Sequence, residues 1–407
     1  MNSCRRASFG SIRTAACCWT ARRPSRQGRT DASLQPIAEQ IAIKYKKAER
    51  FGVMLGFDGF IDSVVRAVRR RDEEDQARFF ETMSEFGHYL VEKSGKNCSI
   101  ELVEQTNKLG GNMPIMALAL GRLGFRLTSI GALGSEGIKP QFSELTGTVH
   151  EAISVTDPGF STAIEFRDGK VMLADVSCLD SMDWDRLVQC VGKERLLSWF
   201  DSNPLICLLN WSETKHASQI WEGFLNEIIP NARNASEKTI FIDLSDCSKK
   251  SEADLRRAFS LLKAFKRHCN VVLSMNENEL ATAGRKLLDQ DEQDMAHAAR
   301  QLYEYAGVDQ LVVHVKDGAF AWSGDKLFQA DSYAIEEPVI LTGSGDHFNA
   351  GYCSGQLLGL GVKESLQTGN AVASYYVKHG TSPTPAQLVQ HLAGFHDDDQ
   401  PSEKQPG

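Results

Sequence analysis

The main structural signal in this 407-residue chain is the alternation of short apolar runs with amphipathic stretches. Apolar runs with the length of buried strands lie at 51–57, 127–134, 205–211, 239–245 and 270–276. Stretches with apolar residues at helical spacing lie at 35–50, 113–124, 215–229, 251–267 and 277–306. Strands that are apolar throughout are buried on both faces. Their alternation with helices therefore predicts a mostly parallel sheet in a three-layer α/β/α domain.

The remaining segments carry other patterns. The charged stretch 69–95 has its apolar residues at helical spacing, which predicts an amphipathic helix with a solvated face. Shorter strands are predicted at 98–105, 148–156, 161–175 and 310–322. The last two of these segments each contain a tight turn with Asp-Gly, so each predicts a strand pair. The glycine-rich segment 342–355 begins another helix.

Composition and charge argue against two classes of partner. The chain is 42% hydrophobic and 24% charged, which is typical of a soluble globular protein, and its apolar runs are far too short to cross a bilayer. Residues 1–30 carry seven arginines and no acid, which leaves 38 basic against 53 acidic residues in the rest. The rest of the chain, with a net charge of −15, is a poor partner for nucleic acid, because phosphate neutralisation needs clustered Lys and Arg. We expect neither a membrane nor a nucleic acid as partner.

The two ends of the chain differ from the rest. Residues 1–34 are rich in Arg, Ser, Ala and Cys and predict a disordered extension, with an organellar transit peptide as the alternative. The polar residues 396–407 predict a disordered tail, which leaves 35–395 as the folded domain. Ten cysteines without a CxxC pair or a Cys/His cluster predict reduced thiols and a cytoplasmic protein. Import into an organelle through the Arg-rich leader is the alternative location.

Polar residues cluster where the predicted strands end, which is where ligands bind in an open α/β sheet. The strand-end residues are Asp58, Asp62, Gly110–Asn112, Asp243, Asp246, Asn276, Glu279 and Gly343–Asp346. Each of them alone has a structural explanation, as a helix cap, a first-turn acid or a tight turn. Asp346, directly behind two glycines, fits either a helix-capping acid or a catalytic base beside an anion-binding loop.

Three motifs together resemble those of the ribokinase-like (PfkB) carbohydrate kinase family. GGNMPIMALALGRLGFRLTSIGALG at 110–134 is similar to the N-terminal signature of that family, and TGSGDHFNAGYCSG at 342–355 to its C-terminal signature. Asn276 and Glu279 match its N-x-x-E motif. The similarity covers about residues 52–390, and the motifs occur in the order of the family.

The resemblance implies a phosphotransferase with an alcohol group as acceptor: a kinase that uses ATP and Mg²⁺ on a small sugar or sugar-like substrate. Asp346 would be the base, with Gly343, Ser344 and Gly345 as an anion hole at a helix N-terminus. Substrate contacts are implied for Asp62, Asp58, Gly110, Gly111 and Asn112. Nucleotide contacts are implied for Asn276, Glu279, Lys316, Gly318 and Asn370. Glu279 would also hold Mg²⁺ through water.

The resemblance further implies a ribokinase-like fold with a small β lid, from about 98–105 and 148–175, which covers the sugar and offers a surface for a homodimer. The match departs from the family at Ile340 and Leu341, where relatives usually carry Asp-Thr, and at Ile115, where they carry Asn. These departures keep two alternatives open. One is a nucleoside kinase of the same family, and the other is a non-catalytic sensor of a sugar or nucleotide.

Overall fold

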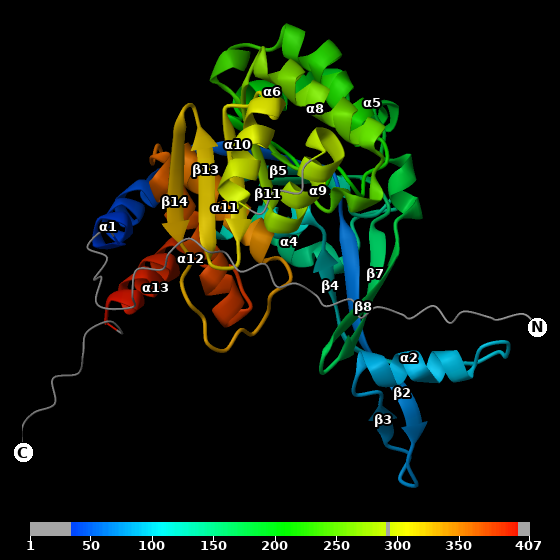
Figure 1. Ribbon diagram of the computed structural model, residues 1–407. Coiled ribbons are helices and arrows are strands. Elements are labelled where there is room, and N and C mark those ends of the chain that lie inside the picture. Colours follow the sequence, from blue (N-terminus) through cyan, green and yellow to red (C-terminus); the bar gives the residue numbers. More distant parts are fainter. Residues whose placement is uncertain (1–33, 290–293, 398–407) are drawn as a thin grey trace, which may run out of the picture.

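The computed structural model describes residues 34–289 and 294–397, and in this part of the chain nine strands form one large sheet (Figure 1). Their order is β14 (Lys326–Asp331), β13 (Gly318–Ser323), β12 (Gln310–Val315), β11 (Asn270–Asn276), β10 (Thr239–Asp243), β9 (Leu205–Leu208), β1 (Gly52–Gly56), β5 (Arg126–Ala132) and β6 (Glu151–Thr156). The strands from β12 to β6 are parallel, while β13 and β14 are antiparallel additions at one edge. The predicted mostly parallel sheet is confirmed.

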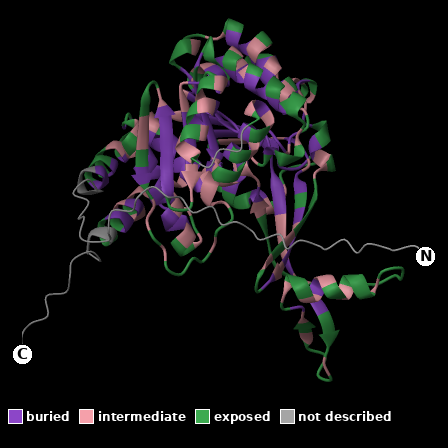
Figure 2. Ribbon diagram, in the orientation of Figure 1, coloured by how far each residue is buried: buried purple, intermediate pink, exposed green. Residues whose placement is uncertain are grey.

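Helices cover both faces of this sheet. One layer contains α5 (Trp184–Val191), α6 (Lys193–Ser202), α7 (Ala217–Gly223), α8 (Glu252–Lys266), α9 (Glu277–Leu288) and α10 (Met295–Ala306). The other contains α1 (Leu34–Lys44), α3 (Asn112–Arg122), α4 (Ser143–Thr148), α11 (Ser344–Leu357), α12 (Val362–His379) and α13 (Pro385–Asp397). Met54 packs in the first core, whereas Val53 and Leu55 pack in the second, because successive side chains of a strand point to opposite faces. The buried sheet between the two layers is visible in Figure 2.

The described residues also form a separate small sheet that projects from the α/β/α body (Figure 1). Its strands are β3 (Ala77–Phe79), β2 (Phe60–Arg71), β7 (Gly159–Phe166) and β8 (Gly169–Asp175), with β4 (Leu102–Gly110) paired to β2. Helix α2 (Met83–Glu92) packs against it through Phe80, Phe86 and Phe166. This small sheet corresponds to the predicted β lid.

Three sequence predictions for the lid region are corrected by the structure. The helix predicted over 69–95 is wrong in its first part, because residues 60–71 form β2 and α2 begins only at Met83. The strand predicted at 98–105 begins at Leu102 and continues to Gly110. The segment 148–156, predicted to belong to the lid, contains β6, which pairs with β5 in the large sheet. In β2, Val65 and Ala67 are buried while the arginines between and after them are more exposed, and this charge obscured the strand alternation.

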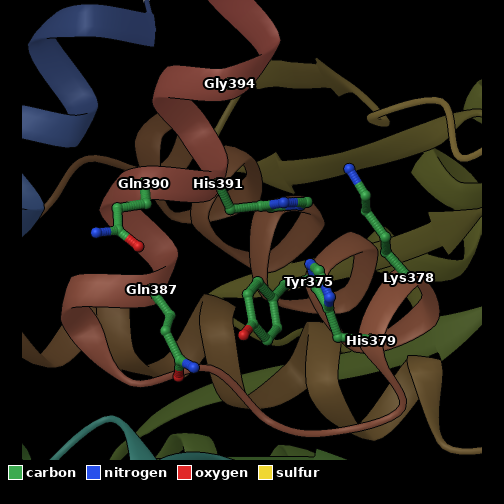
Figure 3. Close-up of a pocket in the computed structure, with 7 residues that line it drawn as sticks. All are labelled: Tyr375, Lys378, His379, Gln387, Gln390, His391 and Gly394. Carbon is green, nitrogen blue, oxygen red and sulfur yellow. The ribbon is translucent and has the colours of Figure 1, made fainter.

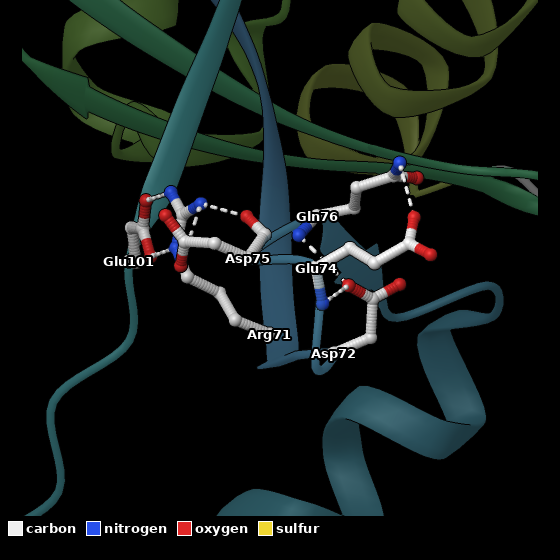
Figure 4. Close-up of polar contacts among 6 residues, drawn as sticks. All are labelled: Arg71, Asp72, Glu74, Asp75, Gln76 and Glu101. Carbon is white, nitrogen blue, oxygen red and sulfur yellow. Dashed lines mark hydrogen bonds and ion pairs between the residues drawn. The ribbon is translucent and has the colours of Figure 1, made fainter.

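The tip of the small sheet is tied by polar contacts (Figure 4). The Arg71 guanidinium binds the Glu101 carboxylate and donates to the Asp75 carbonyl oxygen at 2.6 Å. Asp72 Oδ1 accepts a hydrogen bond from the backbone N–H of Gln76 at 2.8 Å, which closes the turn. These groups are exposed, and exposed ion pairs contribute little to stability. The position of the tip therefore depends mainly on the small apolar core beneath it.

The sequence predicts a folded domain over residues 35–395. Residues 1–33 of the predicted leader and 398–407 of the predicted tail lie outside the described residues, while Leu34 begins α1 and Asp397 ends α13. Among the helices of the described residues, none is both long enough and apolar enough to span a membrane.

Candidate functional site

Four carboxylates gather at the carboxyl ends of the parallel strands. Asp58 follows β1, Asp243 ends β10, Glu279 lies in the first turn of α9 after β11, and Asp346 lies in the first turn of α11. Their proximity is evident in the pKa of Asp346. Burial raises this pKa well above its usual range, and the charges of the other three carboxylates raise it further.

Glu279 and Asp243 are too close for both to be charged at low cost. Burial raises the pKa of Glu279 to about 8, with the Asp243 charge as the second cause. Burial also raises the pKa of Asp243 to about 6. A divalent cation bound through water would relieve this repulsion, and Mg²⁺ prefers carboxylate oxygens and water as ligands. Among the described residues, no group of three or more His, Cys, Asp or Glu side chains is placed to hold a metal ion.

Asn276 and Glu279 form a capping box at the start of α9. The Asn276 Oδ1 accepts hydrogen bonds from the N–H groups of Asn278 at 2.9 Å and Glu279 at 3.0 Å. In return, Glu279 Oε2 accepts from the Asn276 N–H at 2.9 Å, and Oε1 accepts from the Asn276 amide at 2.8 Å. This motif therefore acts as a helix cap, which is the structural explanation that the sequence offered for it. The cap also fixes the Glu279 carboxylate at the edge of the acidic cluster.

The Asp58 carboxylate accepts hydrogen bonds from groups within the protein. Its Oδ1 accepts from the Met113 N–H and its Oδ2 from the Asn112 N–H, both at 2.8 Å, so it caps the N-terminus of α3. The Asn210 amide also donates to Oδ2 at 2.8 Å. Both oxygens of the fully buried Asp58 are thus engaged within the protein, and Asp58 does not line the cavity that Asp62 lines. The Asn112 backbone N–H is part of the same cap, and the substrate contact predicted for this residue stays a prediction.

Gly110 and Gly111 let the lid approach α3 closely. A Cβ on Gly110 would overlap the Asp62 carboxylate. Gly111 has a φ of 94°, and a Cβ there would lie 2.7 Å from Asp58 Oδ2. Asp62 lines a cavity of about 190 Å³, together with Ile115 from α3 and residues of the α11 and α12 segments. Of the two predicted sugar anchors, Asp62 is the one that faces a cavity.

The loop before α11 is held from both sides. Gly343 has a φ of 89°, which favours glycine. The Tyr376 hydroxyl donates to the Thr342 carbonyl oxygen at 3.0 Å, and the His347 ring stacks on Tyr376 with 3.6 Å between ring centroids. Burial lowers the pKa of His347 to about 4, so the ring is neutral. Its Nδ1–H donates to the Gly343 carbonyl oxygen at 2.7 Å, which leaves Nε2 as the acceptor for Ser382.

The predicted anion hole is partly available. The Ser344 N–H donates to the Leu341 carbonyl oxygen at 3.2 Å, so one of its donors is engaged. The N–H groups of the first helical turn have no partners within a helix, and those of Gly345 and Asp346 lie in the first turn of α11. Together with the helix dipole they favour an anion at this end of α11.

A second cavity, of about 730 Å³, lies on the other side of the α11 N-terminus. It is lined by the end of β12, by the connection 332–341, and by residues of α11 and α12, including Ser344 and Gly345. Lys316 and Asn370, predicted to contact the nucleotide, also line it. The Asn370 amide donates to the carbonyl oxygens of Ala330 and Asp331 at 3.1 and 3.0 Å, which leaves its Oδ1 for a ligand.

Gly318 has a structural role instead. It is buried in β13, and a Cβ there would lie 2.6 Å from the Ala330 carbonyl oxygen of the neighbouring strand β14. It does not line the second cavity, so the nucleotide contact predicted for this residue has no support in the geometry. The glycine is required by strand packing, which a sequence motif does not distinguish from ligand contact.

Two residues of this site were not predicted. His314 is the penultimate residue of β12 and lines the second cavity, and a Cβ on Gly345 would lie 3.1 Å from its ring. Burial lowers its pKa to about 4. Asn210 has a positive φ of 53°, donates to Asp58, and has a buried Oδ1 without a hydrogen-bond partner among the described residues. The sequence signal for Asn210 is its position directly after an apolar strand. His314 lies within an apolar run, so the sequence carries no signal for it.

Comparisons with known proteins agree with this geometry. The model of a family described as prokaryotic ketohexokinase matches residues 28–395. The ketohexokinase of Haloferax volcanii is 28% identical over 347 residues, which cover 85% of this chain and 92% of that protein. Arabidopsis thaliana ribokinase, solved with ribose and ATP, has a TM-score of 0.61 at 18% identity and covers 84% of this chain and 98% of its own. A putative ribokinase II from E. coli, solved with ATP and Mg²⁺, has a TM-score of 0.60 at 14% identity, covering 84% of this chain and 99% of its own. At these identities the two structures establish the fold alone.

Proposed function

Since the chain belongs to the prokaryotic ketohexokinase family, whose members are phosphotransferases with an alcohol acceptor, we propose that it transfers the γ-phosphate of ATP to a hydroxyl of a ketohexose. The resemblance to ribokinase-like carbohydrate kinases found in the sequence is confirmed. The activity as a sugar kinase follows from the family, and the identity of the sugar is the part that is proposed.

One observation carries the proposal for the site: the N-terminus of α11 separates two cavities. Thr342 and His347 line the smaller cavity, which also contains Asp62. Ser344 and Gly345 line the larger one. Asp346 belongs to the same helical turn. A sugar in the smaller cavity and a nucleotide in the larger one would therefore meet at Asp346.

The chemistry then follows from these positions. The free N–H groups at the start of α11 would bind the transferred phosphoryl group, in which negative charge is spread over three oxygens. Asp346 would accept the proton of the sugar hydroxyl, and its raised pKa brings it nearer to the working pH of a general base. Glu279, with Asn276, would hold the waters of a Mg²⁺ ion. That ion neutralises phosphate charge and offsets the repulsion among the carboxylates.

The nucleotide base would lie against the connection between β14 and α11. Leu341 is 66% exposed and lines the larger cavity, as do Ile335 and Pro338. An apolar wall of this kind suits a flat heterocycle. Lys316 and His314 at the end of β12 would face the phosphate chain. Leu341 stands where relatives usually carry Thr, so this part of the site differs from a standard sugar kinase.

Turnover of a substrate panel tests the proposal. Purified protein with Mg²⁺ and ATP is offered ketohexoses, aldohexoses and nucleosides, and ADP release is measured. We expect turnover with a ketohexose to exceed that with the other classes, and Asp346→Asn to abolish it. Preferred turnover of a nucleoside would contradict the proposed substrate. Thermal stabilisation by a sugar without any turnover would support a non-catalytic sensor instead.

A homodimer through the lid remains a prediction. The lid exposes Phe160, Met172 and Leu173 at 45%, 54% and 56% of their surface, and exposed apolar groups of this kind favour association. Sedimentation of the wild-type protein should show a dimer that Leu173→Glu dissociates. A monomer at all concentrations would refute the dimer without affecting the proposed activity.

A further inference from the structure

A pocket outside the site described above lies between the last turns of α12 and helix α13 (Figure 3). Its volume is about 330 Å³, and its lining comes from two helices only. The residues are Tyr375, Lys378, His379, Gln387, Gln390, His391 and Gly394. None of these described lining residues is acidic, and six of the seven have polar side chains. The pocket therefore offers mainly hydrogen-bond donors and positive charge.

The basic groups of this pocket lie close to one another. The Tyr375 ring packs against the His379 ring with centroids 4.3 Å apart and against the edge of the His391 ring at 5.3 Å. The two imidazole rings are 6.1 Å apart. Burial lowers the pKa of His391 to about 4, and the nearby Lys378 and His379 lower it further. The His391 ring is therefore neutral, and the positive charge of the pocket comes from α12.

The charge of the α12 terminus alone does not account for the pocket. Lys378 and His379 lie in the last turn of α12, where cations interact favourably with the helix dipole. His391 belongs to the other helix, however, and is only 9% exposed. Gln387 accepts two hydrogen bonds from Thr384 through its Oε1, at 2.9 and 3.0 Å, so its amide nitrogen is the end left for a ligand. An oriented amide from α13 thus complements the basic residues of α12.

The pocket is connected to the larger cavity of the active site by one hydrogen bond. The Ser374 hydroxyl donates to the Ala371 carbonyl oxygen at 3.0 Å, so it accepts from the His391 Nε2–H at 2.8 Å. Ser374 also lines the cavity in which we place the nucleotide. A ligand that moves His391 or α13 would therefore act on a residue in the wall of that cavity.

We propose that the pocket formed by Lys378, His379 and Gln387 binds a small phosphate-bearing metabolite, and that its occupancy alters ATP binding through His391 and Ser374. A phosphate group matches the lining because it carries up to two negative charges and only acceptor oxygens when fully ionised. Transition metals fit less well, since the lining supplies no thiolate or carboxylate and Lys378 would repel a cation. The phosphate site stands on the geometry of this pocket, whereas its effect on ATP rests on the proposed function.

The first experiment measures phosphate binding by calorimetry on the full chain, with inorganic phosphate and a hexose monophosphate as separate probes. Saturating ADP and Mg²⁺ are present so that the anion site at α11 does not contribute. The test variant is Lys378→Gln/His379→Gln, whose two positions are exposed. Lys363→Gln, an exposed lysine in the first turn of α12, removes a charge from the same helix and is the matched control.

We expect the double variant to weaken binding of both probes at least about tenfold, the effect of losing charge-assisted hydrogen bonds, while Lys363→Gln leaves binding unchanged. Tighter binding of the hexose monophosphate than of inorganic phosphate would identify a sugar phosphate as the source. Binding that is equal in the wild type and the double variant, or absent from the wild type, would overturn the site.

The second experiment tests the connection to the active site. In the wild type and in Lys363→Gln, phosphate should change the KM for ATP about fivefold, while in the double variant it should have no effect and basal kcat should be unchanged. Phosphate binding without any change in the KM for ATP would refute the coupling. Failure of the protein to phosphorylate any sugar would refute the proposed function, and the calorimetric result would still decide the phosphate site.

Discussion

Replacement of Asp346 by Asn tests the assignment of the base most directly. The change keeps the size of the side chain and leaves the supports of the loop in place, since Tyr376 holds Thr342 and His347 holds Gly343. Substrate and nucleotide affinity should therefore change little. Loss of a general base lowers kcat by about 10²–10⁴-fold, which corresponds to about 3–5 kcal/mol in the activation barrier. The measurement is steady-state ADP release with both substrates varied.

Stability provides the second readout for Asp346→Asn. Burial and three neighbouring carboxylates raise the pKa of Asp346, so the folded protein disfavours its charge at neutral pH. An amide removes that charge, and the ligand-free variant should melt at a higher temperature than the wild type. Asp325→Asn, an exposed residue in the turn between β13 and β14, is the control and should change neither quantity. A kcat within tenfold of the wild type would refute Asp346 as the base. A lower melting temperature would refute the electrostatic reasoning.

Three further predictions concern residues around Asp346. Burial raises the pKa of Glu279 from 4.5 to about 8, so the folded protein retains a proton that the unfolded chain releases. Stability without Mg²⁺ should therefore fall as pH rises between these values, and Glu279→Gln should flatten that fall in urea titrations. His314→Ala should raise the KM for ATP about tenfold and leave the KM for the sugar unchanged, as expected for one lost charge-assisted contact. Tyr376→Phe removes the hydrogen bond to Thr342 and should cost about 1 kcal/mol of stability in the same titrations. An unchanged pH dependence of stability in Glu279→Gln, an unchanged KM for ATP in His314→Ala, or an unchanged urea midpoint in Tyr376→Phe would each contradict its prediction.

The architecture of the large sheet can be predicted from local sequence pattern alone. The runs that became β1 and β9 carry no polar side chain, and β10 and β11 contain the apolar triplets 240–242 and 271–273; such uninterrupted apolar runs are typical of strands buried on both faces. The motif residues could be located for a similar reason. Gly110–Gly111, Asn276 with Glu279 and Gly343–Asp346 lie at strand ends and helix starts, where local backbone geometry selects glycine and capping side chains.

The lid was harder to derive from sequence. The alternation in β2 is masked by its arginines, and its partners β4 and β7 lie far along the chain. A polar strand forms only if such distant partners pair with it. The local pattern does not show these partners, so it assigns the last residues of β2 to a helix. The same limit applies to β6, whose choice between the two sheets depends on its neighbour β5.

The environment of each acidic residue depends on packing between segments that are distant in the sequence. Asp58 and Asp62 lie four positions apart and look equivalent in sequence, yet three donors from α3 and Asn210 engage Asp58, while Asp62 faces a cavity. Likewise, the pKa of Asp346 is raised by burial and then by carboxylates at the ends of three other strands. Burial and charge proximity are set by packing between segments that are distant in sequence. Local sequence specifies the residue types available for the chemistry, and packing determines which of them are free to perform it.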